Sequence, residues 1–202
     1  VIEDSKEVQL QRKHVLQLEA RPPDPRGRGA VGIRDLFTAT LRMRPDRIVV
    51  GDVRGAEALE IVQAMTSGHG GCLATLHATY PRDALTRLET MAMMSDVELP
   101  LSALRLQIAS AVNLIVQVSR IADGSRKVTH VTEVLGFDLE RGAYATQDLF
   151  VREYLGGPGA SGVASRLVPT GVLPHCLPQL HQHGVDLPRG VYGAVQQGRH
   201  GQ

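Results

Sequence analysis

The sequence is poor in aromatic residues and in cysteine, and it lacks any long hydrophobic run. Among its 202 residues there is no Trp and there are only three Phe, which disfavours modules that bind RNA or sugars by stacking them on aromatic rings. Cys72 and Cys176 lie far apart and form no metal-type pair, which favours a reduced, cytoplasmic protein. Without a run of about 18 apolar residues no membrane span is predicted, and no signal peptide is recognised.

Neither sign of charge is in excess. The chain has 22 Lys and Arg against 21 Asp and Glu, a formal net charge of +1 at pH 7 with His neutral. Because no strong overall field would attract nucleic acid, we do not expect nucleic acid among the partners. The length suits one domain with a sizeable core. Since the first residue is Val1 rather than Met, we expect the chain to begin inside a larger protein.

Short apolar runs alternate with helical patterns through the first half of the chain. Residues 48–50 and 72–76 are apolar runs without alternation, which is typical of parallel strands buried on both faces. Apolar residues at helical spacing, bounded by proline or glycine, predict helices over residues 33–42 and 56–67 and from Pro81 and Pro100 onwards. This alternation of strand and helix predicts an α/β fold with a parallel sheet.

The segments on either side follow other patterns. Residues 8–10 and 14–18 alternate apolar with polar side chains, which predicts an antiparallel pair. The Pro- and Gly-rich residues 21–29 predict a mobile basic loop. An antiparallel β segment is expected toward the C-terminus, with strands at residues 114–118, 128–134 and 143–149 and turns at residues 123–124 and 141–142.

The composition changes near residue 154. We therefore expect a main domain over residues 1–153 and a glycine- and proline-rich tail over residues 154–202. The tail should hold a flexible joint at residues 156–159 and one short helix within residues 173–183. Its end, from Gly193 onwards, is predicted to be disordered.

Asp52 and Arg54 follow directly after the predicted strand at residues 48–50. Open α/β sheets bind their ligands at the carboxyl ends of the strands. A carboxylate there can hold Mg²⁺ through water or orient the attacking water in phosphoryl transfer, and a nearby arginine can neutralise phosphate charge. The alternative is a surface ion pair, which typically stabilises a protein by about 0–1 kcal/mol.

Two further pairs of residues are candidates for the same site. Glu3 and Asp4 end a short apolar run and can supply a general base and a carboxylate that orders a metal; the alternative is a solvated acidic pair. His69 and His77 stand at opposite ends of the 72–76 strand, so they cannot face one ion without a turn, and no structural metal is predicted. A histidine that contacts phosphate or a neighbouring subunit is favoured over a core histidine.

Arginines are numerous around the proposed site. Arginine suits bidentate contact with phosphate, and we expect two or three of the following to matter and the rest to be ordinary surface residues: Arg21, Arg26, Arg28, Arg42, Arg44 and Arg47. No G-x-x-x-x-G-K-[ST] loop is present, so this chain alone should hold the phosphates of a nucleotide poorly. His175, His181 and His183 surround Cys176 without zinc-finger spacing and are interpreted as incidental.

Taken together, these segments resemble the C-terminal ATPase domain of the type II/type IV secretion ATPases. The resemblance is closest to the CpaF/TadA branch, which serves tight-adherence (Flp) pilus assembly, and it covers roughly residues 1–152 and more loosely 169–188. Several ordered motifs at the right separations carry it: an Asp box at residues 1–4 and 7–10, an LETRPPN-like segment at 18–23, a Walker B region at 42–58, a His box at 68–78, and further matches at 82–91 and 107–111.

The resemblance implies a RecA-like P-loop NTPase core without its N-terminal phosphate-loop portion, assembled as a homo-hexamer on the cytoplasmic face of the inner membrane. There ATP, with Mg²⁺, would drive pilin assembly or protein export through inner-membrane platform proteins. Carried over by position, Glu3 would be the catalytic glutamate and Asp52 the Walker B acid, with Asp4, Arg54 and His77 near the nucleotide. The candidates for phosphate or inter-subunit contacts would be Arg21, Arg42 and Arg47.

Two departures from the family pattern bear on activity. The chain starts after the family's phosphate-binding loop and N-terminal domain, so it resembles a fragment that is inactive by itself. Asp52 also stands where the family has glutamate, one methylene longer, and a misplacement of about 1 Å can cost around a hundredfold in rate. Two alternatives stay open: a non-catalytic paralogue that docks into an ATPase ring, and a RecA-like nucleic-acid motor, which the near-neutral charge disfavours.

Overall fold

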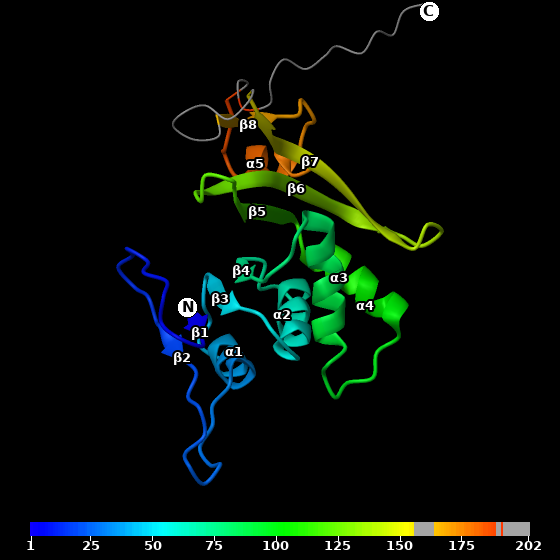
Figure 1. Ribbon diagram of the computed structural model, residues 1–202. Coiled ribbons are helices and arrows are strands. Elements are labelled where there is room, and N and C mark those ends of the chain that lie inside the picture. The colour runs from blue at the N-terminus through cyan, green and yellow to red at the C-terminus, as the bar shows by residue number, and fades with distance from the viewer. Residues whose placement is uncertain (156–163, 189–190, 192–202) are drawn as a thin grey trace, which may run out of the picture. The chain divides into compact units, whose positions relative to one another are not determined.

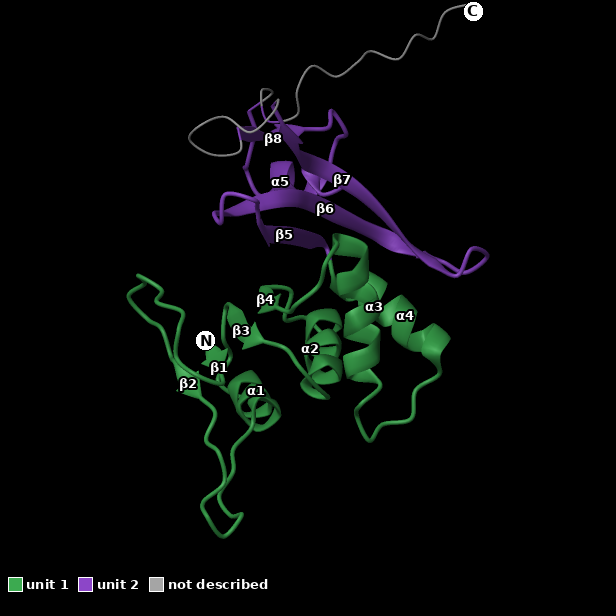
Figure 2. Ribbon diagram, viewed as in Figure 1, with its two compact units in different colours: residues 1–112 green, residues 113–202 purple. Residues whose placement is uncertain are grey.

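The computed structural model describes residues 1–155, 164–188 and 191 (Figure 1). The chain forms two compact units, residues 1–112 and residues 113–202 (Figure 2). The joint expected at residues 156–159 and the disorder expected from Gly193 onwards lie outside the described residues. The domain division after residue 153 stays a prediction.

The first unit is built on a four-stranded sheet in the order β2-β1-β3-β4, in which every neighbouring pair of strands is parallel. The strands are β1 (Ile2–Glu3), β2 (Leu18–Glu19), β3 (Ile48–Asp52) and β4 (Cys72–Thr75). The parallel sheet confirms the α/β class expected from the alternation of strand and helix.

Four helices of this unit occupy the predicted segments. They are α1 (Ile33–Leu41), α2 (Glu57–Thr66), α3 (Pro81–Ala92) and α4 (Leu101–Ala111). Pro81 stands in the first turn of α3, where its missing N–H leaves no backbone bond unmade. Gly68 follows the end of α2 with φ +104°, a conformation that a glycine adopts without steric cost. None of the helices in the described ranges is long and apolar enough to cross a membrane.

The core of the first unit holds the middle of the sheet in place. Val50 of β3 and Phe37 of α1 are fully buried, as are Ile2, Leu85 and Ile108. Helix α2 packs against α1, α3 and α4, and its apolar residues bury because they recur at helical spacing. A strand fixed at Val50 delivers the next residues, Gly51 and Asp52, to its carboxyl end.

The antiparallel pair predicted at residues 8–10 and 14–18 is wrong. In the structure residues 5–17 contain no strand, and Leu18–Glu19 joins β1 as a parallel neighbour. The physical reason lies in Glu3, whose Oε1 accepts hydrogen bonds from the backbone N–H groups of Glu7 and Val8. Those N–H groups are therefore not free to form a strand ladder.

The expectation that residues 72–76 form a buried strand is only half right. A strand forms at Cys72–Thr75, but among the described residues it pairs only with β3 and stands at the edge of the sheet. Leu73 on this strand is 58% exposed, because nothing in the described residues covers it. An apolar run predicts a strand, but the run does not fix which strand lies at the edge.

The second unit is an antiparallel sheet in the order β5-β6-β7-β8, with a short helix. Its elements are β5 (Leu114–Arg120), β6 (Arg126–Asp138), β7 (Ala143–Tyr154), β8 (Ser165–Pro169) and α5 (Leu177–Gln182). The three predicted strands, the two turns and the short helix are confirmed. Gly124 and Gly142 take positive φ angles of 82° and 61° in the turns. Strand β8 was not predicted from the sequence.

Candidate functional site

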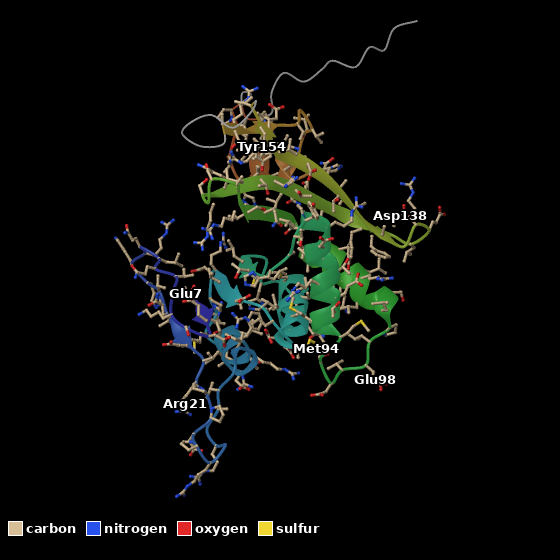
Figure 3. All side chains as sticks on the ribbon, viewed as in Figure 1. Glu7, Arg21, Met94, Glu98, Asp138 and Tyr154 are labelled. Carbon is tan, nitrogen blue, oxygen red and sulfur yellow. The ribbon has the colours of Figure 1, made fainter. Side chains whose placement is uncertain are left out.

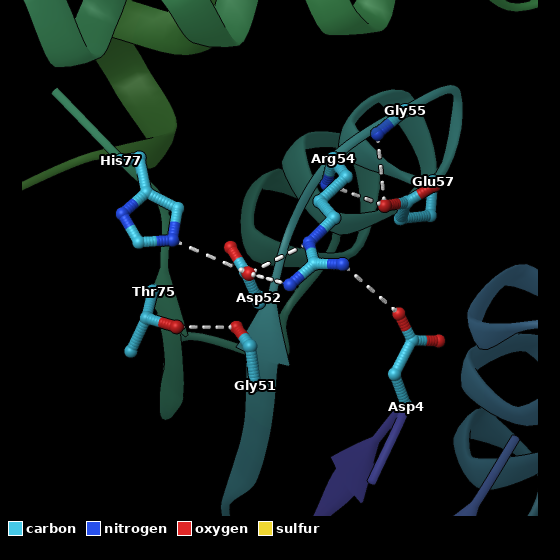
Figure 4. Close-up of polar contacts among 8 residues, drawn as sticks. All are labelled: Asp4, Gly51, Asp52, Arg54, Gly55, Glu57, Thr75 and His77. Atoms are coloured by element: carbon cyan, nitrogen blue, oxygen red, sulfur yellow. Dashed lines mark hydrogen bonds and ion pairs between the residues drawn. The ribbon is translucent and has the colours of Figure 1, made fainter.

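The parallel strands of the first unit end at one edge of their sheet, and polar side chains gather there (Figure 4). Asp52 is the last residue of β3 and pairs in register with Thr75 of β4, with a bulge between Val50 and Asp52. Thr75 Oγ1 donates a 2.6 Å hydrogen bond to the carbonyl of Gly51, and the N–H of Val53 donates to the carbonyl of Thr75. These bonds fix the end of β3 and so the position of Asp52.

Arg54 forms the closest charged contact at this edge. Its Nε and Nη2 atoms lie 2.7 Å and 2.6 Å from Oδ2 of Asp52. This hydrogen bond and the attraction of the carboxylate raise the pKa of the Arg54 guanidinium above its ordinary value. On the other side, Nη1 of Arg54 lies 3.8 Å from Oδ2 of Asp4. Arg54 therefore joins the ends of β1 and β3.

The loop that carries Arg54 is held by a residue that the sequence did not single out. Oε1 of Glu57, in the first turn of α2, accepts hydrogen bonds from the N–H groups of Arg54 at 2.8 Å and Gly55 at 3.0 Å. A carboxylate at a helix N-terminus is also favoured by the helix dipole. The signal that could have found it is an acid at the start of a predicted helix, three residues after Arg54.

His77 lies next to Asp52 from the side of β4. Its Nε2 is 3.5 Å from Oδ2 of Asp52, and its side chain is largely exposed. His77 therefore presents a ring nitrogen to the same carboxylate oxygen that Arg54 contacts (Figure 4). The structure thus brings together four of the residues that the sequence proposed: Asp4, Asp52, Arg54 and His77.

Glu3 lies beside this group but is held differently. It is 5% exposed, and its Oε1 accepts from the N–H groups of Glu7 at 3.2 Å and Val8 at 2.9 Å. A Cβ atom at position 51 would stand 3.1 Å from Cγ of Glu3, so glycine at this position lets the Glu3 side chain lie close against β3. A buried carboxylate held by backbone donors is a fixed group rather than a solvated one.

The three candidate arginines lie outside this cluster in the described chain. Arg21 begins a loop closed by its backbone bridge to Val31, and its Nε donates to the carbonyl of Gly29 (Figure 3). Arg42 follows α1 as its C-cap. Arg47 precedes β3, at the opposite end of the strand from Asp52, and its Nη1 donates to the carbonyl of Asp46. Inter-subunit contact by these arginines stays a prediction.

Sequence reasoning also missed a pocket next to the cluster. It has a volume of roughly 780 Å³ and is lined by residues from the loop after β4, by one face of α3 and by Arg54: His77, Ala78, Thr79, Asp83, Thr86, Arg87, Thr90, Met91 and Met94. The available signal was the spacing of Asp83, Arg87 and Thr90 along α3, since residues three and four apart share one face of a helix. Asp83, Arg87 and Thr90 are exposed, whereas Met91 belongs with Leu85 and Leu88 to the buried stripe of the helix.

In the second unit, the segment containing His175 and Cys176 is organised by a buried acid. Glu133 of β6 is 5% exposed. Its Oε2 accepts from the N–H of His175 at 3.0 Å and from Nε2 of Gln147 at 2.7 Å, while its Oε1 accepts from the N–H of Cys176 at 3.3 Å. These bonds tie the segment before α5 to the sheet, so His175 and Cys176 have a structural setting that the sequence did not reveal.

The two cysteines are less reactive than ordinary thiols. Burial raises the pKa of the Cys72 thiol to about 11, and burial with the nearby charge of Glu133 also raises the pKa of Cys176. Thiols with raised pKa values stay protonated near neutral pH and are poor nucleophiles. Neither cysteine is therefore a candidate nucleophile.

Replacing Glu133 with Gln is expected to lower the free energy of unfolding by about 1–3 kcal/mol at pH 7, because the amide cannot accept every bond that the carboxylate accepts. Burial opposes ionisation of Glu133, but the hydrogen bonds from His175, Gln147 and Cys176 outweigh it, and the pKa of Glu133 lies below its ordinary value. The stabilisation is therefore complete above the ordinary pKa of 4.5 and is lost as the pH falls through the lower folded-state pKa.

Urea unfolding of the native chain and the Glu133→Gln variant, from pH 7 down through the pH range below 4.5, measures this effect. The matched control is Glu153→Gln, since Glu153 is exposed and pairs with the exposed Arg166 at 3.3 Å. The difference between native and Glu133→Gln should narrow as the pH falls. A difference that is constant with pH, or equal to that of the control, contradicts the assignment.

The geometry of the first unit can be set beside known proteins. A family model described as type II/IV secretion system protein matches residues 1–149. The chain belongs to this family. It is 37% identical over 130 residues to a putative conjugal transfer protein of Mycobacterium tuberculosis, covering 64% of this chain and 36% of that protein. It is 39% identical over 131 residues to the type IV secretion system protein PtlH of Bordetella pertussis, covering 62% and 38%.

The fold of the chain is also similar to that of a solved structure. The VirB11 ATPase of the Brucella suis type IV secretion system, solved in complex with sulphate, is 29% identical to the chain with a TM-score of 0.56. The match covers 64% of this chain and 38% of VirB11. The chain is therefore an α/β relative of a secretion ATPase, and it spans 36–38% of the length of these relatives.

Proposed function

We propose that the chain is part of an ATPase subunit that powers secretion or pilus assembly, in the CpaF/TadA branch of its family. The observation that carries the proposal is the gathering of Asp4, Asp52, Arg54 and His77 at the carboxyl edge of a parallel sheet. That edge is where open α/β sheets bind ligands. The match to secretion proteins and the similarity to a VirB11 ATPase support the same chemistry.

In this proposal Glu3 takes a proton from the water that attacks the terminal phosphate. Both hydrogen bonds to the Glu3 side chain in the described structure fall on Oε1, which leaves Oε2 to accept that proton. The backbone N–H groups of Glu7 and Val8 hold the carboxylate in one orientation. A base that is already held in the correct orientation lowers the barrier to reaction, because no entropy is lost in orienting it at each turnover.

Asp52 is suited to hold a Mg²⁺ ion that arrives with ATP. Oxygen ligands are those that Mg²⁺ prefers, and the contacts of Asp52 with Arg54 and His77 all fall on Oδ2, leaving Oδ1 for the ion or its water. When bound, the ion would neutralise charge on the transferred phosphate. Arg54, which reaches Asp4 only loosely, can turn a nitrogen toward the phosphate while Asp52 retains it.

The assembled enzyme is proposed to have a RecA-like core, to form a homo-hexamer and to work at the cytoplasmic face of the inner membrane with platform proteins there. The conjugal transfer and type IV secretion roles named for the relatives support this setting. The chain itself carries no phosphate-binding loop, and we propose that it hydrolyses ATP only as part of the longer parent protein.

The proposal is tested by measuring phosphate release from ATP, in the presence of Mg²⁺, for the purified parent and for this chain alone. The parent should hydrolyse ATP with a kcat in the range typical of enzymes, about 1–10³ s⁻¹. The chain alone should show no ATP hydrolysis above background. A parent that forms rings but does not hydrolyse ATP would instead identify a non-catalytic ring component.

A further inference from the structure

The short loop between β3 and α2 carries Arg54, and its backbone is held by side-chain and backbone acceptors. At its start Val53 is 1% exposed, and the N–H of Val53 donates to the carbonyl of Thr75 at 2.8 Å. The next two N–H groups, of Arg54 and Gly55, both donate to one oxygen, Oε1 of Glu57, at 2.8 Å and 3.0 Å (Figure 4). The Glu57 carboxylate thus fixes the backbone at the residue that carries the guanidinium.

Glu57 holds this loop rather than capping helix α2. A capping side chain accepts hydrogen bonds from the free N–H groups of the first helical turn. Here the N–H groups of Ala58 and Leu59 already donate to backbone carbonyls, each at 3.1 Å. Glu57 instead accepts from the two residues that precede Ala56, the N-cap. A Cβ atom at position 55 would stand 3.2 Å from Oε2 of Glu57, so Gly55 lets the carboxylate lie close to the loop.

The guanidinium of Arg54 depends on this backbone because its side chain has little packing to order it. The side chain is 66% exposed, and an arginine side chain loses much rotamer freedom when it is ordered. Its Nε and Nη2 both contact Oδ2 of Asp52, at 2.7 Å and 2.6 Å. If the Arg54 backbone moved, the guanidinium would leave Oδ2, and the Asp52 carboxylate would lose a contact that fixes its orientation.

We propose that Glu57 is a positioning residue for the proposed reaction and that it acts through Arg54. It holds the Arg54 backbone so that the guanidinium stays on Oδ2 of Asp52. This inference rests on the proposed function, because the orientation of Asp52 affects catalysis only if Asp52 holds the metal ion. Groups that orient metal-binding side chains typically contribute about 10–100-fold to activity, and Glu57, which acts through a second residue, is expected at the lower end.

The NMR signal of the Arg54 Nε–H in this chain tests the positioning directly, and its absence from Arg54→Lys assigns it. In Glu57→Ala this N–H should exchange with water about tenfold faster, the factor that one lost hydrogen bond contributes. Glu57→Gln should keep the native rate within about twofold, because an amide oxygen can accept both N–H groups. The matched control is Glu60→Ala, which removes the other acid from the first turn of α2, where Glu60 pairs with Arg34 at 2.6 Å.

In the parent, Glu57→Ala should lower kcat for ATP hydrolysis about tenfold and change KM less, whereas Glu57→Gln and Glu60→Ala should keep kcat within about twofold. Equal exchange of the Arg54 Nε–H in the native chain and Glu57→Ala, or an equal effect of Glu60→Ala, would overturn the inference. Full turnover by Glu57→Ala, or a Glu57→Gln variant as slow as Glu57→Ala, would also overturn it. A parent without turnover, in which Glu57 still governs the Arg54 signal, would instead remove the proposed function and leave the positioning of Arg54 standing.

Discussion

Replacing Glu3 with Gln in the full-length parent is expected to lower kcat for ATP hydrolysis by about 10²–10⁴-fold, the range in which general base catalysis contributes. The amide oxygen of Gln can still accept from the N–H groups of Glu7 and Val8, which the Glu3 carboxylate accepts in the native chain at 3.2 Å and 2.9 Å. The fold around β1 should therefore persist while the proton acceptor is lost. Steady-state phosphate release, with ATP binding measured alongside, gives the result.

The control for Glu3 is its near neighbour Glu7. Glu7→Gln removes an exposed carboxylate whose attraction for Arg54 is weaker than that of Asp52 or Asp4, and it should leave kcat within about twofold, because exposed charges contribute little. If Glu3→Gln retains full turnover, or if it loses turnover only because ATP no longer binds, then Glu3 is not the base. Loss of turnover in both variants would point to a general effect on the loop instead.

Replacing Asp52 with Asn is expected to lower kcat by about 10²-fold, because the site loses the negative charge that holds the metal ion and Arg54 in place. Folding should be affected little. The contact of Asp52 with Arg54 involves an exposed guanidinium, and exposed pairs stabilise a protein by only about 0–1 kcal/mol. A large loss of rate with a small loss of stability would separate a catalytic role from a structural one.

Two comparison variants sharpen this second result. Asp46→Asn removes an acid at the opposite end of β3 and should leave the rate unchanged. Asp52→Glu keeps the charge and supplies the longer acid that the sequence resemblance leads one to expect. No gain in rate for Asp52→Glu would show that the shorter acid is fully competent, whereas unaltered turnover in Asp52→Asn would contradict the assignment of Asp52.

Much of the first unit could be predicted because its signals are local. Pro81 and Gly68 mark helix ends by their backbone geometry alone, and the apolar run that includes Val50 predicts a buried strand whichever elements cover it. Asp52, Arg54 and His77 could be placed at one edge because parallel strands end together. These predictions needed only the order of residues along the chain.

The features that the sequence could not predict depend on contacts between distant residues. The pattern of residues 8–10 predicts a strand, but in the structure the carboxylate of Glu3 accepts a hydrogen bond from the backbone N–H of Val8, and no strand forms there. Leu73 lies on an edge strand, which no local pattern marks. Arg47 is close to Asp52 in sequence, but β3 separates the two residues by the length of a strand. Glu133 contacts residues more than 40 positions away.

The measurement that tests the central claim most directly is a double-mutant cycle on ATP turnover by the parent. Wild type, Glu3→Gln, Asp52→Asn and the double variant are compared under one set of conditions. Residues that act together in one catalytic site are strongly non-additive, so the double variant should be no more than about tenfold slower than the slower single variant. A double variant whose loss equals the product of the two single losses would contradict the claim that Glu3 and Asp52 form one site.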